Sequence, residues 1–146
     1  MQMKTVIVMR GISGSGKSSI AQQLAPNWAI CSTDNYFMVG GEYKFDRSKL
    51  GEYHKLNFES FCKFLTDGIS TVIVDNTNVK RKEFQKYIDK AKENGYEVVE
   101  VTIGNPWRQN GDMRFIDWDY VDKCIIRNAH AVPADTIRQQ ARNFEC

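Results

Sequence analysis

The stretch GISGSGKS, residues 11–18, decides the fold that this sequence predicts. It fits the pattern Gly, four residues, Gly, Lys, then Ser or Thr. The β-branched apolar run from Thr5 to Met9 precedes it and predicts a buried parallel strand. Ser18 to Ala25 follows it and predicts a short helix, which Pro26 ends. Strand, loop and helix in this order indicate a P-loop, which binds phosphate groups.

The residue types of the loop suit a triphosphate. Glycines have no Cβ, so backbone N–H groups can approach the phosphates closely, and the helix that follows adds the positive end of its dipole. Lys17 supplies a positive charge for the β- and γ-phosphates, and the Ser18 hydroxyl is a hard ligand for Mg²⁺. We therefore expect ATP, or another NTP, and Mg²⁺ as cofactors. The predicted nucleotide contacts are Gly11, Ser13, Gly14, Ser15, Gly16, Lys17, Ser18 and Ser19.

Length and composition limit the number of domains, the partners and the cellular location that the sequence predicts. A chain of 146 residues predicts one domain over residues 1–146, with a core that needs no disulfides. The net charge of +2 is too small to indicate a nucleic-acid partner by itself. No apolar run reaches the length of a transmembrane helix, so we expect no membrane partner. Four scattered cysteines predict free thiols and a cytoplasmic location, and the oligomeric state stays open.

Two acidic residues follow predicted strands, where open α/β sheets bind ligands. A short strand from Trp28 to Cys31 leads to Asp34, our candidate general base, which would accept the proton of an acceptor hydroxyl. The alternative is that Asp34 caps a turn or helix. The strand from Thr71 ends at Asp75, which we expect to hold Mg²⁺ or its water shell.

The rest of the chain alternates between strands and helices. This alternation predicts an α/β fold of P-loop NTPase type, a parallel sheet with helices on both faces. We expect a small hairpin at Gly40-Gly41, helices over residues 48–66, 80–93, 117–130 and 133–144, a fourth strand over 96–103 near a sheet edge, and a loop over 104–112.

One helix carries the only concentration of basic residues in the chain. Lys82, Lys86 and Lys90 form an i, i+4 row on the helix of residues 80–93. A nucleic-acid footprint is one interpretation. A solvated helix face is the preferred one, because acidic residues are interspersed. His54, on the preceding helix, is interpreted as a solvated or partly buried surface histidine.

With these pieces in place, the chain resembles the P-loop 5′-polynucleotide kinase family, which includes phage and RNA-repair kinases and vertebrate polynucleotide-kinase-like proteins. The resemblance rests on residues 11–18, on STDNYF at 32–37, on VDNTN at 74–78, and on RNAH at 127–130 followed by Val132-Pro133. It implies four parallel strands in the order 2-3-1-4, with the Asp75 strand beside the P-loop strand, and a helical lid.

The resemblance also implies roles for single residues. Asp34 matches the general base of the family, and Lys17 and Ser18 match its phosphate and metal contacts. Arg127 matches a lid arginine that reaches the ATP phosphates, and a guanidinium there would stabilise the γ-group. The alternative for Arg127 is a cation on a helix surface.

The acceptor side departs from the phage pattern. Phage kinases carry an arginine three residues after the base, and this chain has Phe37 there. Residues 75–78 match the vertebrate form, Asp-Asn-Thr-Asn. We take Asp34, Phe37, Asn76 and Asn78 as candidate substrate residues.

Three functions remain open on the sequence. The first is a kinase acting on a 5′-hydroxyl of DNA or RNA, with Lys17, Asp34 and Arg127 as catalytic residues. The second is a small-molecule kinase for a nucleoside or nucleotide, in which Tyr36, Phe37 and Tyr43 would line a closed acceptor pocket. The third is an ATP-binding adaptor module without transfer.

Overall fold

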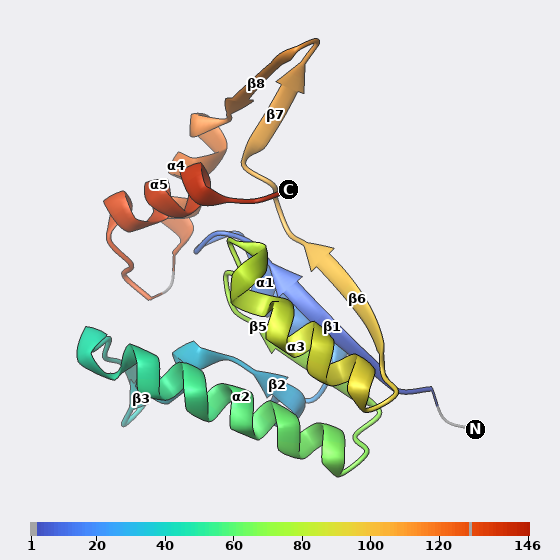
Figure 1. Ribbon diagram of the computed structural model, residues 1–146. Helices are drawn as coiled ribbons and strands as arrows, with labels where there is room; N and C mark the ends of the chain where they lie inside the picture. Colours follow the sequence, from blue (N-terminus) through green and yellow to red (C-terminus); the bar gives the residue numbers. More distant parts are fainter. Residues whose placement is uncertain (1–2, 129) are drawn as a thin grey trace.

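A four-stranded parallel sheet forms the centre of the molecule (Figure 1). The computed structural model describes residues 3–128 and 130–146. The strands are β1 (Thr5–Arg10), β2 (Ile30–Cys31), β5 (Thr71–Asp75) and β6 (Glu97–Thr102), in the order β2-β5-β1-β6. This confirms the expected order 2-3-1-4. In the register of β1 and β5, Met9 lies beside Asp75, so the P-loop and this carboxylate leave the sheet together.

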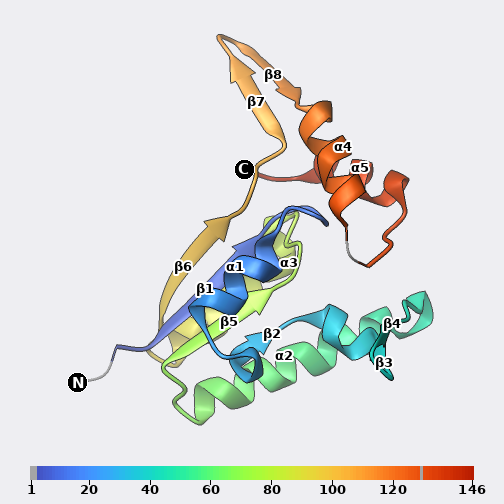
Figure 2. The same ribbon diagram turned by 180° about the vertical axis from the view of Figure 1, so that it is seen from behind.

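Helices cover both faces of the sheet, as predicted. On one face, valines of β1 and β5 pack against α2 (Leu50–Thr66) and α3 (Arg81–Glu93). On the other face, Met9 and Ile73 pack against α1 (Lys17–Leu24). Figures 1 and 2 show α1 on the side opposite α3. The alternation of strand side chains explains the two layers, since neighbouring residues point to opposite faces.

Two predicted boundaries were wrong. Trp28 and Ala29 belong to a 3-10 turn, Asn27–Ala29, closed by the bond from Ala29 N to the Pro26 carbonyl. α4 (Trp118–Arg127) ends before His130, because Asn128 is extended and its side chain accepts from the backbone N–H groups of His130 and Val132. The predicted helix and the RNAH block also include Ala129, which lies outside the described residues.

The predicted loop over residues 104–112 is largely a β-hairpin. β7 (Trp107–Asn110) pairs antiparallel with β8 (Met113–Ile116). Gly111 has φ 62° at the first position of the two-residue turn, where a type II′ turn favours glycine. The hairpin expected at Gly40-Gly41 is confirmed, and it joins β3 (Met38–Val39) to β4 (Glu42–Tyr43). Two further 3-10 helices span Thr33–Phe37 and Arg47–Lys49.

A second hydrophobic core lies beyond the carboxyl edge of the sheet (Figure 2). It is formed mainly by α4 and α5 (Ala134–Asn143), which we call the lid. Ile12 of the P-loop and Val79 are fully part of this core, so the lid packs directly on the phosphate-binding segment. In the described part of the chain, no helix is long and apolar enough to cross a membrane.

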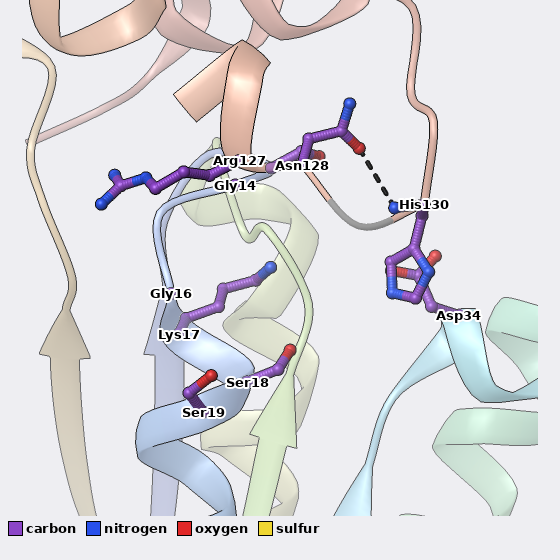
Figure 3. Close-up of a pocket in the computed structure, with 10 residues that line it drawn as sticks. Gly14, Gly16, Lys17, Ser18, Ser19, Asp34, Arg127, Asn128 and His130 are labelled. Carbon is purple, nitrogen blue, oxygen red and sulfur yellow. Dashed lines mark hydrogen bonds between the residues drawn. The ribbon is translucent and has the colours of Figure 1, made fainter. Parts of the chain in front are cut away.

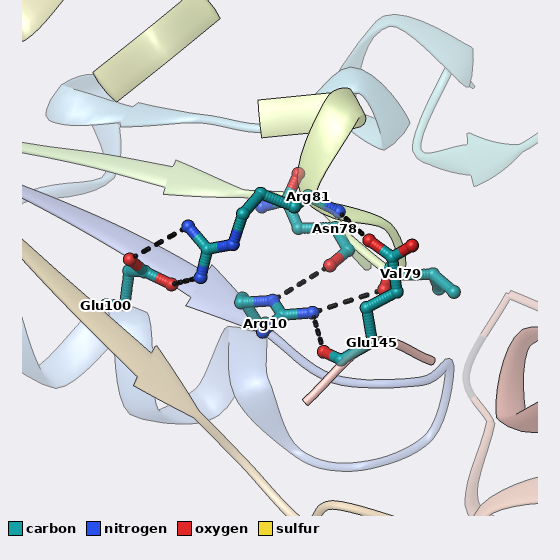
Figure 4. Close-up of polar contacts among 6 residues, drawn as sticks. All are labelled: Arg10, Asn78, Val79, Arg81, Glu100 and Glu145. Atoms are coloured by element: carbon teal, nitrogen blue, oxygen red, sulfur yellow. Dashed lines mark hydrogen bonds and ion pairs between the residues drawn. The ribbon is translucent and has the colours of Figure 1, made fainter. Parts of the chain in front are cut away.

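Arg10, the last residue of β1, is 3% exposed and joins the sheet to the segments that follow β5 and α5 (Figure 4). Its Nε donates to the Asn78 carbonyl at 3.0 Å. Its Nη2 donates to the Val79 carbonyl at 3.1 Å and also to the Glu145 carbonyl. The guanidinium lies 4.8 Å from the ring centre of Phe84 and 4.7 Å from that of Phe144. Burial lowers the pKa of this guanidinium from its ordinary value.

We predict that Arg10→Met lowers the free energy of unfolding by about 3 kcal/mol, because buried carbonyls lose their donor. Arg81→Met is the matched control, since Arg81 bonds Glu100 at 2.8 Å on the surface and such pairs contribute about 1 kcal/mol or less. Urea unfolding of both variants measures the difference. Equal losses for the two variants would contradict the role of Arg10.

Candidate functional site

A cavity of about 440 Å³ lies between the P-loop, the Thr33–Phe37 turn and the lid (Figure 3). Its lining residues are Ser13, Gly14, Gly16, Lys17, Ser18, Ser19, Asp34, Arg127, Asn128 and His130. The three predicted catalytic residues, Lys17, Asp34 and Arg127, therefore share one cavity. Gly11 and Ser15 belong to the P-loop but do not line the cavity.

The P-loop has the backbone that its glycines allow. Gly16 has φ 94° and caps α1, which leaves the first N–H groups of the helix free for a ligand. Gly14 has φ 83°, and a Cβ there would lie 2.0 Å from the Cys124 carbonyl oxygen of α4. Gly14 is therefore required both for the turn and for the contact with the lid.

Two bonds to Gln140 of α5 hold Ser13. The Ser13 backbone N–H donates to Gln140 Oε1 at 2.9 Å, and Gln140 Nε2 donates to the Ser13 hydroxyl at 3.1 Å. Sequence reasoning missed Gln140, because nothing in the pattern of α5 marks a glutamine that reaches back to the P-loop. Ser15 Oγ, in contrast, is buried without a partner among the residues that the structure describes.

Ser18 and Asp75, the two residues expected to serve a metal, meet at the base of the P-loop. The Ser18 hydroxyl donates to Asp75 Oδ2 at 2.8 Å. Asp75 is 5% exposed, and its Oδ1 is buried without a partner in residues 3–128 and 130–146. A hydroxyl beside an unpaired carboxylate oxygen fits Mg²⁺, which takes few protein ligands and completes its shell with phosphate and water oxygens.

Asp34 is held by Tyr43 of the β3–β4 hairpin. The Tyr43 hydroxyl donates to Asp34 Oδ1 at 3.1 Å. Burial, and then the charge of Asp34, raise the pKa of Tyr43 above its ordinary value, so the hydroxyl stays protonated and donates. The Tyr43 ring also packs on the ring of His130, with centroids 4.3 Å apart. The hairpin, the carboxylate and the lid thus meet at one point, which the sequence did not predict.

The Arg127 side chain is folded back on its own helix. Figure 3 shows its guanidinium on the side of α4 away from Asp34 and His130. Its Nη2 lies 3.7 Å from Cys124 Sγ. To contact a triphosphate bound on the P-loop, the Arg127 side chain would have to change rotamer and leave Cys124.

Three candidate substrate residues lie outside this cavity. Phe37 is 1% exposed and packs on Tyr53, with ring centroids 4.7 Å apart. Asn78 is 3% exposed, has φ 48°, and donates from Nδ2 to the Met9 carbonyl at 2.7 Å. Asn76 Oδ1 accepts from the Thr33 backbone N–H at 3.0 Å. The asparagines thus hold the ends of β1 and of the turn that carries Asp34.

These features define a P-loop kinase fold, with a phosphate-binding loop after β1, an acidic residue at the end of the adjacent strand, and helices above both. The chain belongs to the AAA domain family, whose model matches residues 6–110. The resemblance to polynucleotide-kinase-like P-loop proteins that the sequence predicted is confirmed.

Solved structures of low sequence identity share the fold. A chain of the Pnkp1/Rnl/Hen1 RNA repair complex has a TM-score of 0.63 and 16% identity, over 98% of this chain and 44% of that chain. A gluconokinase from Sinorhizobium meliloti 1021 has a TM-score of 0.55 and 17% identity, over 100% of this chain and 78% of that chain.

Curated relatives are much longer than this chain. Human NEDD4-binding protein 2 is 31% identical over 144 residues, which are 96% of this chain and 8% of that protein. Rat 2′,3′-cyclic-nucleotide 3′-phosphodiesterase is 27% identical over 111 residues, which are 73% of this chain and 26% of that protein. This chain therefore spans only a minor part of these relatives.

We predict that Gly14→Ala weakens ATP binding at least about tenfold and lowers the free energy of unfolding by about 2 kcal/mol. The new methyl group meets the α4 backbone, and alanine disfavours the positive φ. Gly51→Ala in α2 is the control, because its methyl group meets nothing within 4 Å and should stabilise the helix by up to about 1 kcal/mol. Calorimetric titration with ATP and thermal unfolding measure both effects. Unchanged ATP affinity in Gly14→Ala would contradict the role of the loop.

Proposed function

We propose that this chain is an ATP- and Mg²⁺-dependent phosphotransferase that moves the γ-phosphate to a 5′-hydroxyl of DNA or RNA. The observation that carries the proposal is the single cavity that contains the P-loop Lys17 on one side and Asp34 on the other (Figure 3). A triphosphate on the loop would present its γ-phosphorus toward Asp34, where an acceptor hydroxyl would lie. The family and the kinase fold support the same reaction class.

In this proposal the acceptor oxygen attacks the γ-phosphorus while the bond to the β–γ bridging oxygen breaks and ADP leaves. Asp34 accepts the hydroxyl proton, and Tyr43 keeps its carboxylate oriented. Lys17 neutralises charge on the β- and γ-phosphates, and the backbone N–H groups of residues 11–19 surround them. Mg²⁺, held by Ser18 and Asp75, would supply further neutralisation of the phosphate oxygens.

Arg127 completes the proposed site from the lid. Arg127 lines the cavity, but its guanidinium lies beside Cys124 and would reach a γ-phosphate only after leaving that contact. We propose that nucleotide binding draws it inward, where it stabilises the charge of the transferring group. The free thiols support a reducing compartment, and we propose the cytoplasm.

A small-molecule kinase is the second candidate. Tyr43 bonds Asp34 directly, and the fold is shared with a gluconokinase. However, Tyr36, Phe37 and Tyr43, the expected lining of a closed acceptor pocket, are not among the residues that line the cavity. The two candidates use the same donor site and differ only in the acceptor. An adaptor without transfer is the outcome if ATP binds but no acceptor is phosphorylated.

The test of the proposal is Asp34→Asn, assayed for transfer of labelled γ-phosphate to a 5′-hydroxyl oligonucleotide. We expect kcat to fall by about 10²–10⁴-fold, because the proton acceptor is lost, while the Kd for ATP changes less than about twofold. Asp112→Asn, at the tip of the β7–β8 hairpin, is the control and should keep full activity. Loss of ATP binding together with transfer in Asp34→Asn would mean that Asp34 supports the fold and is not the base.

The role of Tyr43 gives a separate prediction. Tyr43→Phe should lower kcat about tenfold with an unchanged KM for ATP, because one hydrogen bond to a charged group is lost. Tyr53→Phe is the matched control, since Tyr53 packs on Phe37 in the same aromatic cluster. Steady-state kinetics at saturating acceptor separate the two variants. Equal activity of Tyr43→Phe and Tyr53→Phe would rule out a positioning role for the Tyr43 hydroxyl.

A further inference from the structure

A second cavity, of about 330 Å³, lies between α2 and α3 beside the end of β5. Its polar lining includes His54, Asn76, Asn78, Lys82, Glu83 and Lys86. The prediction of a solvated helix face is confirmed for Lys82 and Lys86, which are exposed. Lys82 and Lys86 line this cavity, whereas Lys90 pairs with Glu93 at 3.3 Å on the surface of α3.

The wall between the two cavities carries the proposed base. Thr33 precedes Asp34, and its backbone N–H donates to Asn76 Oδ1 at 3.0 Å. The Thr33 hydroxyl is hydrogen-bonded to His54 Nδ1 at 3.0 Å. Asn76 and His54 both line the second cavity. The side chains of Asn76 and His54 therefore lie between the second cavity and the turn that carries Asp34.

The second cavity is positive and rich in hydrogen-bond donors. Lys82 and Lys86 stand one turn apart on the same side of α3. The Lys86 ammonium lies 4.9 Å from the ring centre of Phe58 and 5.6 Å from that of Tyr87, which orient it. Glu83 is the one acidic side chain in the lining, and its carboxylate accepts from the Lys80 backbone N–H at 2.7 Å. The cations therefore outnumber the anion.

The uncharged members of the lining can donate as well. Asn76 uses its oxygen for Thr33, which leaves its NH₂ group for a ligand. Burial and the neighbouring Lys86 lower the pKa of His54, so the imidazole is neutral at neutral pH. In the tautomer that accepts from Thr33 at Nδ1, His54 carries its proton on Nε2 and can donate to an anion. Ammonium, amide and imidazole donors together suit a phosphate group.

We propose that this second cavity binds the phosphate on the 3′ side of the terminal nucleoside of the acceptor strand, with Lys82 and Lys86 as its main charges. The inference rests on the proposed function, in which the 5′-hydroxyl lies at Asp34. In a nucleic acid the next phosphate is one sugar away from that hydroxyl, and the second cavity is the neighbouring site that Asn76 and His54 join to the Asp34 turn through Thr33. Phe37 cannot bind this phosphate, because its side chain is uncharged and buried.

The test compares acceptors that differ only in this phosphate. The acceptors are a nucleoside, the same nucleoside with a 3′-phosphate, and a 5′-hydroxyl oligonucleotide. The variant is the double substitution Lys82→Met with Lys86→Met, which keeps the apolar stems and removes the charges. Lys90→Met is the matched control, one turn further along the same helix and outside the cavity.

We expect the double variant to raise the KM of the two phosphate-bearing acceptors at least about tenfold over Lys90→Met. The KM for the nucleoside and for ATP should change less than about twofold, because neither places a phosphate in this cavity. The logarithmic salt dependence of oligonucleotide binding should also become less steep by about one to two units.

Two results would overturn the inference. The first is an equal KM for the double variant and Lys90→Met with phosphate-bearing acceptors. The second is a parallel rise in KM for the nucleoside, which would mean that the lysines act through the fold.

If the unaltered chain phosphorylates no acceptor, the proposed function fails. The phosphate site in the second cavity can then still be tested separately, by the binding of an oligonucleotide. Fluorescence anisotropy with a 5′-hydroxyl oligonucleotide, without ATP, is the measurement. Binding that Lys90→Met keeps and the double variant loses would support the phosphate site. Equal binding by the two variants, or no binding by the unaltered chain, would refute it.

Discussion

A buried guanidinium at the end of β1, next to the P-loop, ties this strand to two distant segments of the chain. Arg10 donates to the carbonyls of Asn78, Val79 and Glu145, and its partners come from the segment after β5 and from the segment after α5. A guanidinium inside a protein is stable only when its donors are satisfied, so each of these segments has a defined place relative to β1. The P-loop begins at the next residue, and its position depends on the same anchor.

The lid and the P-loop behave as one packed unit for the same reason. Gly14 lies against the Cys124 carbonyl, and Gln140 holds both the N–H and the hydroxyl of Ser13. Contacts of this kind define the loop before nucleotide arrives, which reduces the entropy that binding must overcome. The hydroxyl of Tyr43 and its stacking on His130 extend the same arrangement to Asp34. The P-loop side and the Asp34 side of the cavity are therefore organised by contacts between distant segments.

The parts that sequence predicts well are those fixed by local pattern. The P-loop, the alternating valines of β1 and β5 and the glycine hairpin at residues 40–41 depend on near neighbours in the chain. The predicted strand Trp28–Cys31 is too long at its start, because the hydrogen bond from the Ala29 N–H to the Pro26 carbonyl closes a 3-10 turn there. The β7–β8 hairpin was missed, although Gly111-Asp112 is a recognisable turn pair for it.

The site partners could not be predicted, because they come from distant parts of the chain. Gln140 reaches Ser13 across 127 positions, and Arg10 reaches Glu145 across 135. Lys82 and Lys86 line the second cavity because α2 lies beside α3, and the periodicity of the sequence does not give this placement. Phe37 follows Asp34 closely in sequence, yet the 3-10 turn sends its ring into an aromatic core.

The most direct measurement of the central claim is the fate of the γ-phosphate with the unaltered chain. The chain would be incubated with ATP, Mg²⁺ and a 5′-hydroxyl oligonucleotide, and the products mapped by mass spectrometry. The account predicts one ADP for each phosphoryl group found on the 5′-terminal oxygen. ADP and free phosphate with an unmodified oligonucleotide, or bound ATP without turnover, would contradict it.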